Sequence, residues 1–163
     1  MTLKYRTGMH RSNYVRSVGF TLVELALILL ISALLFSTVR PAYTHLVDEA
    51  KSTDTKKSLT DISLQIDAYY KANGHFPNSL SDVFSPVPVD PWGNPYQYLR
   101  IDGGSPGVGK LRKDRNLVPI NSDYDLYSMG PDGKTASPLT ASVSRDDIVR
   151  GRNGDFFGIA TNY

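Results

Sequence analysis

The sequence predicts an α+β fold in which a long N-terminal helical stem packs against a small antiparallel β-sheet head with a loop-rich C-terminus. Apolar residues occupy most positions of 20–39, and apolar positions then recur at helical spacing as far as Tyr69 and Tyr70. After Gly74 the chain becomes rich in proline and in tyrosine-containing segments typical of turns and strands. We therefore divide the chain into a basic leader (1–19), a transmembrane half of the stem helix (20–41), an amphipathic half (42–73) and a β head (74–163).

The leader is defined by its charge. Residues 1–19 carry four basic side chains and no acid, whereas the remainder has 14 basic and 16 acidic residues. A basic segment ahead of an apolar run indicates a membrane protein whose N-terminus stays in the cytoplasm. The alternative, a basic arm for nucleic acid, finds no support in the rest of the chain, so we expect no nucleic-acid partner. The sequence leaves open whether translation begins at Met1 or at Met9.

The apolar half of the stem is long enough to cross a bilayer. Residues 20–39 contain a single charge, Glu24, and twenty helical residues span about 30 Å, the thickness of the hydrocarbon core. A secretory signal would have a shorter apolar core and a small-residue cleavage site behind it. Pro41 predicts a kink in the helix.

The amphipathic half is expected to end at Asn73, because Gly74 supplies a C-terminal stop. A short helical turn is predicted at 79–84, and strands are predicted at 96–101 and 123–129 from their tyrosine-rich, alternating character. The remainder, from Gly130 onward, is expected to be mostly loop. The chain has no cysteine, so no disulfide holds these loops.

The junction between leader and stem carries the strongest functional signal. Gly19 immediately precedes the apolar run, and Glu24 is the fifth residue of that run. A carboxylate inside a membrane helix costs roughly 2.5 to 3.5 kcal/mol at mid-membrane. Cleavage between Gly19 and Phe20 would create an α-amine that a neighbouring subunit's Glu24 could pair with, which would select the register of packed helices. The alternative is that Glu24 lies near the headgroups of an ordinary single-span anchor.

The sequence Gly19 followed by FTLVEL resembles the prepilin peptidase site of type IV pilins and type II secretion pseudopilins. This resemblance implies a pilin-like fold, cleavage after Gly19, N-methylation of Phe20 and control of subunit incorporation by Glu24. The segments IDAYYKANGHFPNSL, DPWGNPYQYL, YDLYSMGPDG and DDI are similar, in the same order, to those of the major pseudopilins of type II secretion systems.

A calcium site is expected in the C-terminal loops. Calcium takes six to eight oxygen ligands from carboxylates and backbone carbonyls, and such loops offer both. Asp132, Asp146 and Asp147 are the candidate carboxylates. The family resemblance adds the Met129 carbonyl and Ser128 to Asp132, Asp146 and Asp147. The chain departs from the family in a longer loop at 134–145 and an extended tail at 150–163, and the alternative is a plain Asp-Gly turn.

The predicted function is that of a structural subunit of a periplasmic pseudopilus of a type II secretion system. The resemblance implies a homo-oligomeric filament, single-pass anchoring in the bacterial inner membrane with the head in the periplasm, and partners that include other pseudopilins, the assembly platform and prepilin peptidase. The alternatives are a type IV pilin for adhesion, motility or DNA uptake, and a signal-anchored binding protein or enzyme. Catalysis is not expected, because the three histidines show no metal-ligand spacing and no nucleophile motif occurs.

Overall fold

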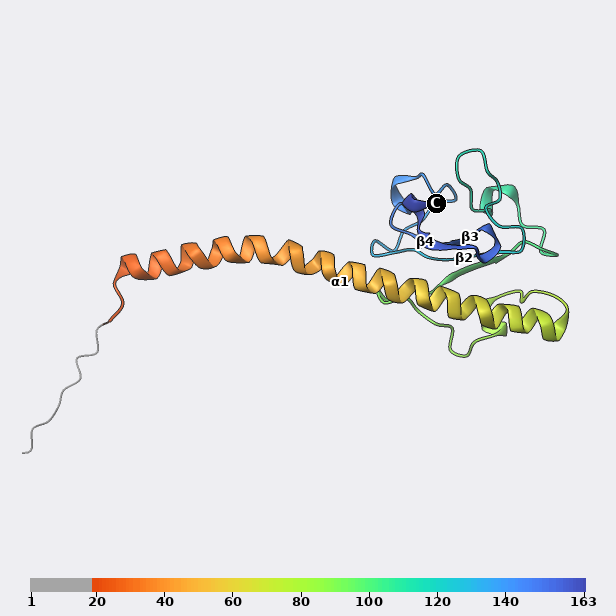
Figure 1. The fold of residues 1–163 in the computed structure, drawn as a ribbon, viewed down its shortest axis with the longest axis horizontal. Helices are drawn as coiled ribbons and strands as arrows, with labels where there is room; N and C mark the ends of the chain where they lie inside the picture. The colour runs from red at the N-terminus through yellow and green to blue at the C-terminus, as the bar shows by residue number, and fades with distance from the viewer. Residues whose placement is uncertain (1–18) are drawn as a thin grey trace, which may run out of the picture. The chain divides into compact units, whose positions relative to one another are not determined.

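A computed structural model describes residues 19–163, apart from the side chains of 38–42. The first 18 residues of the predicted leader lie outside this range. Helix α1 (Leu22–Asn73) is followed by a small α+β region, and the chain divides into two compact units at Pro41 and Ala42 (Figure 1). The α+β class predicted from the sequence is confirmed.

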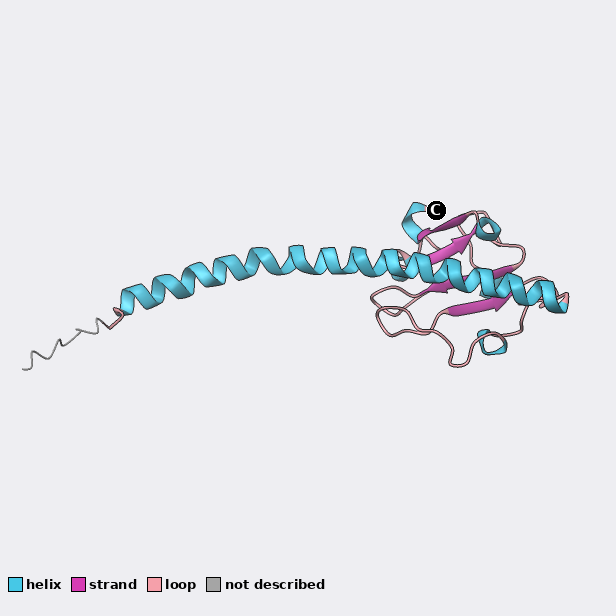
Figure 2. Ribbon diagram, turned by 60° about the horizontal axis from the view of Figure 1, so that its bottom comes forward, coloured by secondary structure: helices cyan, strands magenta, loops and turns pink. Residues whose placement is uncertain are grey.

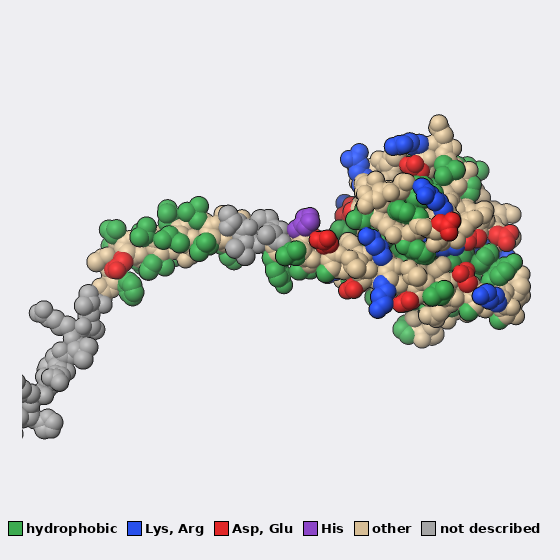
Figure 3. Space-filling view, viewed as in Figure 1, with side chains coloured by type: hydrophobic (Ala, Val, Ile, Leu, Met, Phe, Trp, Pro, Cys, Tyr) green, Lys and Arg blue, Asp and Glu red, His purple; other side chains and the backbone are tan. Residues whose placement is uncertain are grey.

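The first unit is the apolar beginning of α1. Its large hydrophobic side chains between Phe20 and Phe36 are exposed to solvent, at 46% to 86% of their full area. Figure 3 shows hydrophobic side chains covering the visible face of this segment. Across the described side chains at 19–37 and 43–163, no helix is both long and apolar enough to span a membrane.

The second unit begins with the amphipathic half of α1. The helix ends at Asn73, as predicted, and Gly74 adopts a left-handed φ of 74° while its amide donates to the Tyr70 carbonyl at 2.8 Å. Glycine reaches this φ without steric cost, which explains the stop. The predicted short turn is the 3₁₀ helix η1 (Leu80–Asp82).

Four antiparallel strands follow, in the spatial order β1-β2-β3-β4: β1 (Gln97–Arg100), β2 (Tyr124–Ser128), β3 (Ile148–Gly151) and β4 (Phe156–Ile159). The helix crosses one face of this sheet (Figure 2). Strands β1 and β2 confirm the sequence prediction, with Gln97 opposite Tyr127 and Arg100 opposite Tyr124. The remaining short helices are η2 (Val108–Lys110), η3 (Ser142–Ser144), η4 (Arg152–Gly154) and η5 (Ala160–Asn162).

The sequence prediction missed two strands in the last third of the chain. Strands β3 and β4 form a hairpin there, and all four residues of β3 are buried. The charge of Arg150 hid this strand in the sequence, because a buried arginine is rare unless it is paired. In the structure Arg150 Nη2 lies 2.6 Å from Asp123 Oδ2, and its guanidinium stacks 3.9 Å from the centre of the Tyr124 ring.

Two hydrophobic cores lie on opposite faces of the sheet. The larger core joins the helix to the sheet, and its buried members are Leu59, Ile62, Ile66, Leu80, Tyr96, Tyr124, Leu126 and Ile148. The smaller core lies under the C-terminal loops and contains Ile120, Leu139, Val149 and Ala160. The alternation of Ile148 and Val149 between the two cores follows from the two-residue period of a strand. The sheet therefore fixes the C-terminal loops relative to the amphipathic half of α1.

Candidate functional site

The predicted processing and assembly residues lie at the start of α1. Gly19 is exposed, and a Cβ added there would meet nothing within 4 Å. Thr21 and Glu24 exchange hydrogen bonds: the Glu24 amide donates to Thr21 Oγ1 at 3.2 Å, and the Thr21 amide donates to Glu24 Oε2 at 3.3 Å. This reciprocal pattern is a capping box, which satisfies amide groups that a helix start leaves free.

The capping box gives Glu24 a second role that the sequence analysis missed. The T-x-x-E spacing from Thr21 to Glu24 was available as a signal for it. In the single chain the carboxylate therefore has local partners, while the rest of its surface is exposed. A neighbouring amine would compete with, or add to, the hydrogen bonds from Thr21.

A second group of hydrogen-bonded residues lies around the turn at 90–94, directly before β1. Asp90 is buried, and its Oδ1 accepts the amides of Trp92 at 3.0 Å and Asn94 at 2.9 Å. Its Oδ2 accepts a hydrogen bond of 2.6 Å from Ser128 Oγ. Ser128, one of the predicted calcium ligands, is therefore buried and already bonded through its hydroxyl, which also accepts the Gly130 amide at 3.0 Å.

The loop after β2 contacts the segment before β3. Gly130 has a φ of 65°, and a Cβ added to it would lie 2.5 Å from the Asp146 carbonyl oxygen. The Asp132 amide donates to Asp146 Oδ2 at 3.3 Å, and Asp132 Oδ1 accepts the Lys134 amide at 2.8 Å. The structure thus brings Asp132 and Asp146 together at the surface, with the backbone of Met129 in the same loop.

Asp147 is fully buried and faces a different partner. Its Oδ2 lies 2.6 Å from Arg112 Nη2 and accepts a hydrogen bond of 2.7 Å from Thr135 Oγ1. Burial raises the pKa of Asp147 to about 6, while the hydrogen bond from Thr135 and the charge of Arg112 offset part of that rise. Because this value stays below neutral pH, the carboxylate is ionised there and the ion pair with Arg112 is charged.

The predicted calcium ligands do not converge as a single set. Among the described residues, no group of three or more Asp, Glu, His or Cys side chains is arranged to hold a metal ion. Asp132 and Asp146 lie together, but Asp147 is bound by Arg112 and the Ser128 hydroxyl by Asp90. Calcium binding at these residues stays a prediction.

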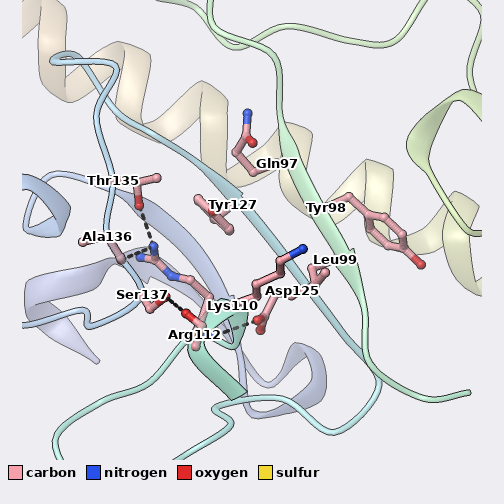
Figure 4. A pocket seen from close by; sticks show the side chains of 11 residues that line it. Gln97, Tyr98, Leu99, Lys110, Arg112, Asp125, Tyr127, Thr135, Ala136 and Ser137 are labelled. Atoms are coloured by element: carbon pink, nitrogen blue, oxygen red, sulfur yellow. Dashed lines mark hydrogen bonds between the residues drawn. The ribbon is translucent and has the colours of Figure 1, made fainter. Parts of the chain in front are cut away.

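Arg112 also borders a surface pocket of about 410 Å³ between β1 and the loop at 135–137. Figure 4 shows the Arg112 side chain reaching Thr135 and Ala136, with Lys110 and Gln97 among the other lining residues. The Arg112 amide donates to Asp125 Oδ2 at 2.9 Å, and burial raises the pKa of this Asp125 carboxyl. The Arg112 guanidinium is paired with Asp147, and the Asp125 carboxylate accepts the Arg112 backbone amide. Lys110 is therefore the exposed cation among the lining residues.

Comparison with known proteins identifies the family. No family model and no solved structure matches the chain. A curated relative from Pseudomonas aeruginosa, named type II secretion system core protein G, is 30% identical over 137 residues, which cover 71% of this chain and 84% of the relative. The chain belongs to the type II secretion system core protein G family. Members from Aeromonas hydrophila and Vibrio cholerae are 29% and 28% identical and are covered over 88% and 89% of their lengths.

This finding confirms the resemblance noted in the sequence. The core protein G family consists of major pseudopilins, which are structural proteins and not enzymes. The seven curated relatives that match the chain all carry the core protein G name, so a type IV pilin is not favoured.

Proposed function

We propose that this chain is the structural subunit of a periplasmic pseudopilus of a type II secretion system, anchored in the inner membrane through residues 20–41 before it assembles. In this proposal prepilin peptidase cuts between Gly19 and Phe20, and the new Phe20 amine is methylated. The head faces the periplasm, and the filament consists of copies of this chain together with other pseudopilins on the assembly platform. Membership of the core protein G family carries the proposal.

The apolar start of α1 supports the anchoring step. Its large side chains are exposed in the single chain, and burying such surface is worth roughly 25 cal/mol per Å² of apolar area. A bilayer covers this surface before assembly, and the helices of neighbouring subunits cover it in the filament. Glu24, the one acid of the segment, then pairs with the Phe20 amine of a neighbour and selects the register.

The N-terminus of the membrane-extracted protein tests the processing step. Intact-mass and N-terminal peptide analysis should give a chain that begins at methylated Phe20. A Gly19→Ala variant, which keeps the rest of the leader, should retain residues 1–19. Wild-type protein that keeps those residues in a strain with active prepilin peptidase would contradict the proposal.

Two substitutions at Glu24 separate charge pairing from helix capping. Glu24→Gln keeps an oxygen that can accept the Thr21 amide but removes the charge, whereas Glu24→Ala removes both. Both variants should insert into the membrane, because losing the acid eases burial. Both should fail to give normal filaments if Glu24 acts through its charge, measured as filament yield at equal membrane abundance. Normal assembly of Glu24→Gln would show that the local cap is the role that matters.

A further inference from the structure

Arg112 is the most completely enclosed cation in the described part of the head apart from Arg150, and its contacts tie together three segments far apart in sequence. It is 2% exposed, and Nη2 binds Asp147 Oδ2 at 2.6 Å. Its Nη1 donates to the Ala136 carbonyl at 2.7 Å and also to Thr135 Oγ1. The guanidinium lies 4.3 Å from the centre of the Tyr127 ring, on the neighbouring strand β2.

The Arg112 guanidinium compensates the negative charge of the buried Asp147 carboxylate. A carboxylate buried as deeply as Asp147 needs a nearby positive charge, because removing an ion from water costs several kcal/mol. The Ala136 carbonyl in the loop at 135–137 accepts two hydrogen bonds, one of 2.9 Å from Ser144 Oγ and one of 2.7 Å from Arg112 Nη1. A planar guanidinium carries several N–H donors in a fixed arrangement, so Arg112 binds the Asp147 carboxylate and the Ala136 carbonyl at the same time.

We infer that Arg112 is the internal cation of the C-terminal loops, and that for Asp147 it takes the place which the family resemblance gives to calcium. The head of this chain therefore folds and keeps its stability without calcium. This inference goes beyond the proposed function, because a pseudopilus subunit could use either kind of cation.

Arg112 and a calcium ion compete for the same carboxylate. Calcium would have to approach an Asp147 oxygen within about 2.3 to 2.6 Å. Oδ2 already lies 2.6 Å from Arg112 Nη2, so a calcium ion there would face a like charge at close range. Oδ1 is buried with no hydrogen-bond partner among the described residues, and an ion bound to it would still lie a few ångströms from the guanidinium. Repulsion between the two cations favours one occupant at a time.

Thermal unfolding of the full-length chain in detergent tests the inference. Trp92 is the one tryptophan in the sequence, and its ring packs against the larger core, so its emission follows the head. Wild-type protein should melt at the same temperature in excess calcium and in excess chelator. Arg112→Met should lower the melting temperature on the order of 10 °C, because it leaves Asp147 as an unpaired buried charge.

Two further variants act as matched controls. Arg145→Met removes the same charge from an exposed side chain two residues before Asp147, and it should melt like the wild type. Arg112→Lys keeps the positive charge but lacks the planar set of N–H donors of the guanidinium. Its melting temperature should therefore lie between those of wild type and Arg112→Met.

Three results would overturn the inference. The first is a wild-type melting temperature that rises in calcium and falls in chelator, with the response abolished by Asp147→Asn. The second is an Arg112→Met variant that melts like wild type. The third is an equal loss of stability in Arg145→Met. The calcium comparison on wild-type protein decides the question even if Arg112→Met does not fold.

Discussion

At the scale of single residues, the start of α1 shows how one side chain can serve both the subunit and the assembly. Thr21 and Glu24 form a closed pair of hydrogen bonds in the single chain, and neither needs a partner from outside to begin the helix. The acid that the sequence suggested for contacts between subunits is therefore held in a defined position beforehand. Holding a side chain in its bound position lowers the entropic cost of the later contact.

Thr21→Ala should loosen the first turn of α1. The substitution removes the hydroxyl that accepts the Glu24 amide, and losing an N-cap side chain costs about 1 kcal/mol. Hydrogen exchange of the Glu24 and Leu25 amides, which donate to Thr21, should become about fivefold faster in detergent, in line with that cost. Thr21→Ser should stay close to wild type, and Thr53→Ala, which alters an exposed threonine in mid-helix, is the control. Unchanged exchange in Thr21→Ala would contradict a stabilising capping box.

One buried and one half-buried tyrosine predict how the head responds to alkaline pH. Burial raises the pKa of Tyr124 to about 12 and also raises the pKa of Tyr98. A raised folded pKa means that the neutral phenol is favoured in the folded state, so its contribution is fully present below the unfolded pKa of about 10 and is lost as pH rises from 10 to 12. The unfolding free energy should fall by up to 1.4 kcal/mol per pH unit for each tyrosine.

Urea unfolding followed by Trp92 emission between pH 8 and 11 measures this loss. Tyr98→Phe should reduce the slope while lowering stability at pH 8, because Tyr98 Oη also donates to the Pro77 carbonyl at 2.8 Å. Replacing the exposed Tyr43 by Phe is the matched control. A stability that stays flat through this pH range would mean that the two phenols are not protected by the core.

At the scale of elements, the β3–β4 hairpin is fixed from outside by the C-terminal residues. Tyr163 lies over Gly151, and a Cβ added to Gly151 would clash with the Tyr163 ring. The same ring meets Phe156 edge-on, with the ring centres 5.2 Å apart. Gly151 is therefore required for space and not for backbone freedom, since it has an extended φ of −143°.

Gly151→Ala should lower the stability of the head by about 1 to 3 kcal/mol, the usual range for an overpacked site. The double variant Gly151→Ala with Tyr163→Leu should recover part of that loss relative to Tyr163→Leu alone, because the clash partner is gone. Gly107→Ala, at a position where a Cβ meets nothing within 4 Å, is the control. Additive losses in the double variant would contradict this account of the hairpin. Trp92 emission gives the melting temperatures of Gly151→Ala, Tyr163→Leu, the double variant and Gly107→Ala, each compared with wild type.

At the scale of the whole molecule, local patterns predicted local structure well. Helical periodicity and Gly74 predicted the end of α1, and alternating tyrosines predicted β1 and β2. The same reasoning missed β3, because Arg150 reads as a surface residue until its pairing with Asp123 is known. It also found Asp147 but not Arg112, which lies 35 residues earlier in a stretch that reads as loop. Sequence spacing does not predict an ion-pair partner that only the tertiary fold brings close.

Because β3 contributes to both hydrophobic cores, its late position in the sequence determines when the head can finish folding during synthesis. Synthesis proceeds from the N-terminus, so the amphipathic half of α1 leaves the ribosome with Leu59, Ile62 and Ile66 uncovered. Ile148 joins these side chains in the larger core, and Tyr163 packs beside the smaller one, so neither core is complete until residues 148–163 have been made. Until then, the exposed apolar face of α1 can form non-native contacts and aggregate. A truncated translation product would keep the exposed apolar face of α1 and lack the strands that bury it. Such a product is expected to be a substrate for quality-control proteases.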